Sequence, residues 1–133
     1  MDKTRLMLKI RELKVYLEEL EELLPDDEAS YLKSLEKRRS VERELQIMIE
    51  CMVDICMLLL KELKLGPPQN EENVLDLLSG KITNIPKLKE MRGFRNILVQ
   101  KYGKIKDPLV FFFASNERED FLVFIKDVKE LMK

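Results

Sequence analysis

Apolar residues recur every three or four positions along most of the chain, which is the spacing of one buried face of an α-helix. The first such face predicts a helix over residues 3–24 and consists of Leu6, Ile10, Leu13, Leu17, Leu20 and Leu24. Pro25 cannot continue this helix. Either Asp26 or Asp27 can cap the next one by accepting hydrogen bonds from its free backbone N–H groups.

The next segment predicts one long helix over residues 28–64. Its first half carries a one-sided apolar stripe of Tyr31, Leu35, Val41 and Leu45. Its second half, residues 45–60, is apolar at 13 of 16 positions and leaves Gln46, Glu50 and Asp54 as a polar stripe. A helix that is apolar almost all round has to be covered almost all round. Either its own neighbours wrap it, or a partner surface covers part of it, most simply a second copy of the chain.

Three further helices are predicted. Gly66-Pro67-Pro68 ends the long helix, and Asn70 caps a short one over residues 71–79, which Gly80 closes. A fourth helix starts at Pro86 and ends at Gly103, and its apolar side comprises Ile85, Leu88, Met91 and Leu98. The last helix starts at Asp107-Pro108 and is loosened near its middle by Asn116. Its buried face comprises Phe121, Phe124, Ile125, Val128 and Leu131.

No strand pattern and no internal repeat interrupt this series. The predicted fold is therefore all-α, a five-helix bundle with an up-down core. A chain of 133 residues with 45% hydrophobic residues suits a single domain over residues 1–133.

The composition narrows the range of functions. Lys and Arg number 24 against 25 Asp and Glu, so the net charge of −1 excludes a globally basic nucleic-acid binder but not a local basic patch. The chain contains no His, which removes a histidine general base, a catalytic triad built on His and any His metal ligand. No metal site and no cofactor are expected.

Cys51 and Cys56 are five residues apart on a predicted helix, which places them about 140° apart around its axis. That geometry excludes a disulfide within the helix, and we expect buried, reduced thiols. The N-terminus is charged from Asp2 and shows no signal peptide. The most apolar stretch, residues 45–60, is too short and too charged to span a bilayer. A cytoplasmic protein is expected.

Charge is distributed unevenly along the chain. Residues 18–28 carry seven acidic residues and no basic one. Residues 87–106 carry a net charge of +6, from Lys87, Lys89, Arg92, Arg95, Lys101, Lys104 and Lys106 against Glu90. A basic cluster near a helix end is where a phosphate would bind. The alternative is a solvated face whose cations interact favourably with the helix dipole.

The stretch MRGFRNILVQKYG, residues 91–103, favours the phosphate site over the solvated face. It resembles the signature of HepT-like toxins, a branch of the all-helical HEPN superfamily, whose pattern is R-N-x-L-V-H-x-Y. Arg95, Asn96, Leu98, Val99 and Tyr102 match this pattern in register. Gln100 stands where the family has His.

The resemblance implies the toxin of a toxin–antitoxin pair, a metal-independent endoribonuclease in which the RNA 2′-OH attacks the adjacent phosphate. Arg95 would stabilise the charge on that phosphate, and Asn96 would be a second contact to phosphate or ribose. Gln100 can form hydrogen bonds but cannot transfer a proton, a loss of roughly 10²–10⁴ in rate. Further phosphate contacts would come from Arg92, Lys101 and Lys104.

The same resemblance implies two protein partners. One is a minimal nucleotidyltransferase (MNT) antitoxin, which would modify Tyr102 with AMP and so block RNA binding. The other is a second copy of the chain in a two-fold homodimer. On an ideal helix residue 100 lies about 140° from Arg95, so a cleft built across a dimer axis, or an early helix end, is needed to bring the two together.

Two other functions remain open. The chain could be a non-catalytic helical dimer that binds a nucleotidyltransferase or its nucleotide substrate, which the missing His favours. A purely structural coiled-coil protein would explain the regular seam of residues 3–24. It leaves the basic cluster and the motif unexplained.

Overall fold

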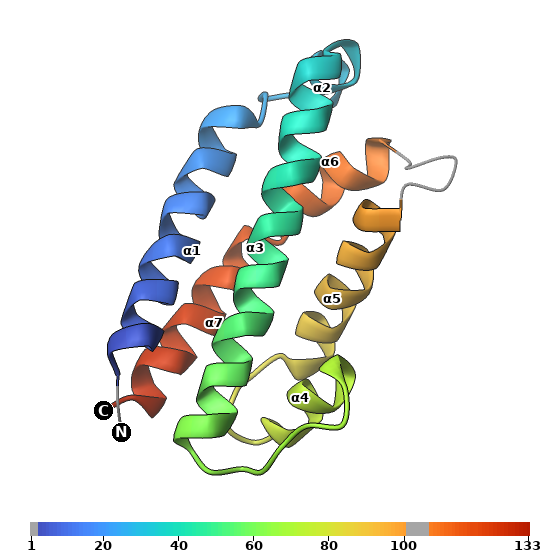
Figure 1. Ribbon diagram of the computed structural model, residues 1–133. Helices are drawn as coiled ribbons and strands as arrows, with labels where there is room; N and C mark the ends of the chain where they lie inside the picture. Colours follow the sequence, from blue (N-terminus) through green and yellow to red (C-terminus); the bar gives the residue numbers. More distant parts are fainter. Residues whose placement is uncertain (1–2, 101–106) are drawn as a thin grey trace.

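The computed structural model describes residues 3–100 and 107–133, which form seven α-helices and no strand beyond an isolated bridge between Ser79 and Ile82 (Figure 1). The helices are α1 (Thr4–Leu23), α2 (Glu28–Lys33), α3 (Leu35–Glu62), α4 (Glu71–Leu77), α5 (Ile85–Gln100), α6 (Asp107–Asn116) and α7 (Arg118–Leu131). The all-α prediction is confirmed. The predicted number of five helices is wrong, because two of the predicted helices are each divided in two.

The first division lies at Ser34, within the predicted helix over residues 28–64. Ser34 has extended backbone angles, and its hydroxyl accepts a hydrogen bond of 3.1 Å from the backbone N–H of Lys37. The serine thus caps α3, while Asp27 caps α2 by accepting from the backbone N–H of Ser30 at 2.7 Å. Leu35 comes directly after the break and is 57% exposed, so it does not belong to the buried stripe predicted for it.

The second division follows Asn116, where a loosened helix was predicted. The Asn116 side-chain amide donates to the backbone carbonyl of Phe112 at 2.7 Å, and this contact satisfies a carbonyl in the last turn of α6. The chain then restarts as α7 at Arg118. The position of the interruption was therefore predicted correctly, but it ends one helix and begins another.

The longer helices α1, α3, α5 and α7 run alternately up and down, as predicted for the core (Figure 1). α3 is central: α1 packs along it, and α4, α5 and α6 also contact it. α7 returns along the bundle beside α1, where Arg118 pairs with Glu21, and both termini lie at the same end (Figure 1). None of the described helices combines the length and apolar character that a bilayer-spanning segment needs.

The core confirms most of the predicted apolar faces. The face of α1 is buried from Leu6 to Leu20, that of α5 from Ile85 to Leu98, and that of α7 from Phe121 to Val128. Leu24 and Leu131 are only partly buried. Cys51 and Cys56 are both buried free thiols, as predicted.

The apolar half of α3 is covered mainly from within the chain. Its buried members include Met48, Met52, Ile55, Cys56 and Leu59, while Met57 is the large apolar side chain of this half that stays exposed, at 43%. The neighbouring helices therefore wrap this segment, and of the two alternatives left open by the sequence the intramolecular one applies. The surface of α3 does not by itself require a second copy of the chain.

Candidate functional site

Helix α5 places the first part of the sequence motif on a flank beside α4. Leu88, Met91 and Leu98 face the core, and Phe94 stacks on Phe113 of α6 with ring centroids 4.2 Å apart. Because one face of α5 is fixed in this way, Arg92 and Arg95 emerge together from a neighbouring face, one helical turn apart. Their side chains are only 20% and 16% exposed.

Both arginines meet one carboxylate. Arg95 Nη2 donates a short hydrogen bond to Oε2 of Glu71, the first residue of α4. Nη1 of Arg92 lies 3.5 Å from the same oxygen. The site is therefore two converging guanidinium groups with one acidic counter-charge, which leaves it a net positive charge and the donor geometry of an anion site.

Asn96 belongs to this cluster. Its side-chain oxygen accepts a hydrogen bond of 3.2 Å from Nη2 of Arg95, so the amide orients the arginine. The Nε groups of Arg92 and Arg95 are both buried and have no hydrogen-bond partner. The structure thus brings together three of the predicted site residues, Arg92, Arg95 and Asn96, with two unused donors.

The remaining predicted residues lie at the end of the motif. α5 ends at Gln100, whose side chain is outside the described part of the chain, as are Lys101, Tyr102 and Lys104. The predicted helix end at Gly103 also falls there. Whether Gln100 approaches Arg95 stays a prediction.

The basic cluster is partly neutralised by carboxylates from elsewhere in the chain. Lys87 pairs with Glu117 at 3.1 Å, and Lys89 pairs with Asp76 of α4. These two lysines precede the arginines on α5, and their ion pairs join α5 to Glu117 and to α4. Among the described members of the cluster, Lys87 and Lys89 therefore fit the alternative of an ordinary paired face, whereas Arg92 and Arg95 converge on one carboxylate.

Sequence reasoning missed Glu71. The residue was assigned only to the start of a short helix capped by Asn70, whose side chain does accept from the backbone N–H of Asn73 at 2.8 Å. Glu71 and Arg95 are 24 residues apart, so no periodicity connects them. The available signal was the need for acidic partners opposite the net +6 of residues 87–106.

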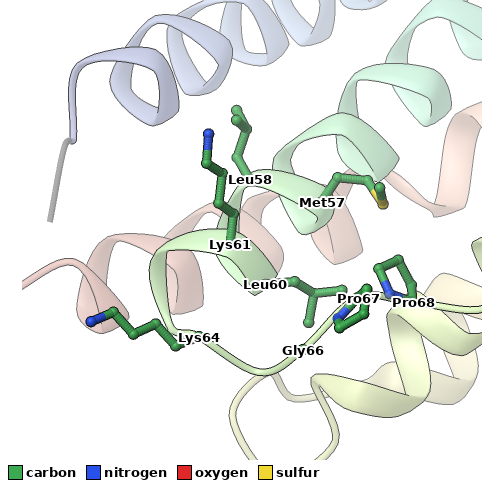
Figure 2. A pocket seen from close by; sticks show the side chains of 8 residues that line it. All are labelled: Met57, Leu58, Leu60, Lys61, Lys64, Gly66, Pro67 and Pro68. Carbon is green, nitrogen blue, oxygen red and sulfur yellow. The ribbon is translucent and has the colours of Figure 1, made fainter.

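Other chemically notable groups lie away from this cluster. Burial raises the pKa of the Cys51 thiol to about 11 and that of Cys56 still further, so neither provides a thiolate near neutral pH. A groove at the end of α3 is lined by apolar side chains, among them Met57, Leu60, Pro67 and Pro68, and by Lys61 and Lys64 (Figure 2). Of the predicted site residues whose side chains the structure describes, none lines this groove.

Comparison with known proteins identifies the family. Three similar solved structures show the same fold at 26–27% identity. A tri-AMPylated HEPN toxin of Shewanella oneidensis in complex with an MNT antitoxin matches with a TM-score of 0.87 and 27% identity, covering 98% of this chain and 99% of that one. A toxin–antitoxin structure with AMP-PNP matches with a TM-score of 0.85 and 26% identity, over 96% and 99% of the two chains.

A third structure, a MntA–HpeT toxin–antitoxin pair with a tyrosine-to-alanine substitution, matches with a TM-score of 0.83 and 27% identity, over 94% and 97% of the two chains. No curated protein matches the chain. The family model for HepT-like ribonucleases matches residues 13–128, which include all of α3, the arginine pair of α5 and Glu71. A match over this length, together with the shared fold, shows that the chain belongs to the HepT-like ribonuclease family.

Proposed function

We propose that the chain is the toxin of a HEPN–MNT toxin–antitoxin pair and that its site takes RNA. The observation that carries this proposal is the convergence of Arg92 and Arg95 on one anionic oxygen, with Asn96 orienting Arg95. Family membership supports an endoribonuclease. The similar structures that contain an MNT antitoxin support an antitoxin of that class as the partner.

The reaction would be metal-independent cleavage by the RNA itself. The 2′-OH attacks the neighbouring phosphorus, the bond to the 5′-oxygen breaks, and the product ends in a 2′,3′-cyclic phosphate. Arg95 stabilises the charge that develops on the phosphate oxygens, and Arg92, Lys101 and Lys104 hold the backbone. A proton has to leave the 2′-OH and another has to reach the 5′-oxygen.

Gln100 impairs these proton transfers in the present chain. An amide does not titrate near neutral pH, and the chain has no His elsewhere to take its place. We therefore expect RNA binding with feeble cleavage. The same observation favours a second candidate function, a non-catalytic HEPN dimer that binds a nucleotidyltransferase or its nucleotide substrate.

Control of the toxin would act on Tyr102. Transfer of AMP to its hydroxyl adds a phosphate charge and bulk close to the end of α5, which would block access of RNA to the arginines. The AMPylated state of the Shewanella oneidensis toxin supports this role.

Restoring the family residue tests the proposal. Gln100→His is expected to raise cleavage of total RNA in EDTA by about 100-fold or more, because imidazole titrates near the working pH. Growth inhibition should appear with it when the variant is expressed without antitoxin. Arg95→Ala in the same background should abolish both effects, since the phosphate charge would be left unstabilised.

Two outcomes separate the candidate functions. Metal-independent cleavage by Gln100→His with cyclic-phosphate ends supports the ribonuclease. If a folded Gln100→His variant is as inert as the parent chain, the ribonuclease proposal fails and the non-catalytic HEPN dimer becomes the better explanation.

A further inference from the structure

Glu71 lies where an anion would be held. Its Oε2 atom accepts from Arg95 Nη2 and lies 3.5 Å from Arg92 Nη1. Guanidinium groups bind carboxylates and phosphates through the same planar set of donors. The position of this oxygen therefore marks the point at which the two arginines converge on a negative charge.

The carboxylate of Glu71 does not satisfy all the hydrogen-bond donors of the two arginines. A single oxygen of Glu71 faces both guanidinium groups, while the Nε groups of Arg92 and Arg95 are buried without a hydrogen-bond partner. Buried donors without partners are unfavourable. A phosphodiester has two non-bridging oxygens, and each can accept more than one hydrogen bond, so it can satisfy more of these donors than Glu71 does.

Glu71 is also the displaceable member of the cluster. Its side chain is 40% exposed, against 16% for Arg95 and 20% for Arg92. It comes from the seven-residue helix α4, whereas α5 is anchored by the core. An ion pair with a partner exposed to this degree is screened by water and stabilises little, so a competing anion can replace it.

We infer that Glu71 is an internal anion that occupies the phosphate subsite between Arg92 and Arg95 in the free protein, and that an RNA phosphate displaces it. This inference rests on the proposed function and adds regulation to the same site. Glu71 lowers the affinity of the subsite for every anion. Only a ligand that makes further contacts through its own phosphate backbone, such as RNA, therefore displaces Glu71 from the subsite.

The test compares Glu71→Gln with Glu72→Gln. Both substitutions remove one negative charge from α4, but Glu72 is exposed and forms no ion pair within the described part of the chain. The probes are a 2′-O-methyl decaribonucleotide, which binds without being cleaved because the nucleophilic 2′-OH is blocked, and inorganic phosphate. We expect Glu71→Gln to lower the Kd for the oligonucleotide by roughly 3- to 10-fold and Glu72→Gln to change it by less than about 2-fold.

Inorganic phosphate should raise the Tm of Glu71→Gln more than that of Glu72→Gln. Arg95→Ala in the Glu71→Gln background should remove both the tighter oligonucleotide binding and the additional rise in Tm. Equal affinities of the two glutamine variants, or weaker binding by Glu71→Gln, would overturn the inference while leaving RNA binding intact. A phosphate effect specific to Glu71→Gln without RNA binding by any variant would support Glu71 as the internal anion of a phosphate subsite, but would overturn RNA as its ligand and with it the proposed function.

Discussion

At the scale of single residues, the buried carboxyl group of Glu44 makes the stability of the folded protein depend on pH. Glu44 lies on α3 and faces Glu19 of α1. Burial, with a smaller contribution from Glu19, raises the pKa of Glu44 from 4.5 to about 7. Because the folded-state pKa lies above that of the unfolded chain, the stability contributed by protonated Glu44 is complete below pH 4.5 and is lost as the pH rises through about 7.

Glu44→Gln should therefore stabilise the protein at pH 8 and have little effect at pH 4, because the amide stays neutral at both. The expected gain in the free energy of unfolding at pH 8 is on the order of 1–3 kcal/mol. Urea denaturation at the two pH values measures it. Glu18→Gln, on the exposed side of α1, is the matched control and should show no such difference between the two pH values.

The candidate site shows which residues sequence reasoning can find. Arg95 and Asn96 were found because the motif keeps them in consecutive positions on one helix. Glu71 was not, because its role depends on how the loop after α3 places α4 against α5. Local patterns therefore identify groups on one element, whereas partners brought together by packing need the fold.

At the scale of elements, apolar periodicity predicted buried faces well and helix ends less well. The predicted apolar stripe from Tyr31 to Val41 continued across the break at Ser34. The spacing of hydrophobic residues does not reveal that a single residue, Ser34, has an extended backbone. The break depends on a local competition, in which the Ser34 hydroxyl takes the backbone N–H of Lys37. At Asn116 the polar residue itself was the signal, and the interruption was placed correctly.

Removing the Ser34 cap should weaken the start of α3. Ser34→Ala leaves the backbone N–H of Lys37 without its side-chain acceptor and should lower the free energy of unfolding by about 1 kcal/mol. Ser34→Asp keeps an acceptor at the same position and should restore most of the loss. Urea titrations of the three proteins measure the difference. A Ser34→Ala variant as stable as the parent chain would contradict the capping role.

At the scale of the whole molecule, the chain wraps the apolar half of α3 with its own neighbours, so α3 leaves little surface for a partner. Unpaired apolar surface lies elsewhere. Ile97 of α5 is 50% exposed and Phe112 of α6 is 61% exposed, on the two helices that the Phe94–Phe113 stack joins. Exposed apolar side chains beside a functional motif are typical of a protein interface.

This surface is where we expect the two-fold homodimer to form. Ile97 and Gln100 both follow Arg95 on α5, and Gln100 lies about 140° around the helix from Arg95. A second copy docked on the exposed face would place the motifs of both chains near one axis, so that Arg95 of one protomer can share a cleft with Gln100 of the other.

Sedimentation at micromolar concentration should therefore show a dimer of the 15.8 kDa chain. Phe112→Glu should dissociate it, because a charge buried in an apolar interface is costly. Leu8→Glu places the same charge on α1, at a side chain 53% exposed, and should leave the dimer intact. Dissociation should also weaken binding of the 2′-O-methyl decaribonucleotide, since each cleft would lose the residues supplied by the partner. If the parent chain sediments only as a monomer, no cleft is shared between protomers, and Arg92, Arg95 and Asn96 form a site on a single chain.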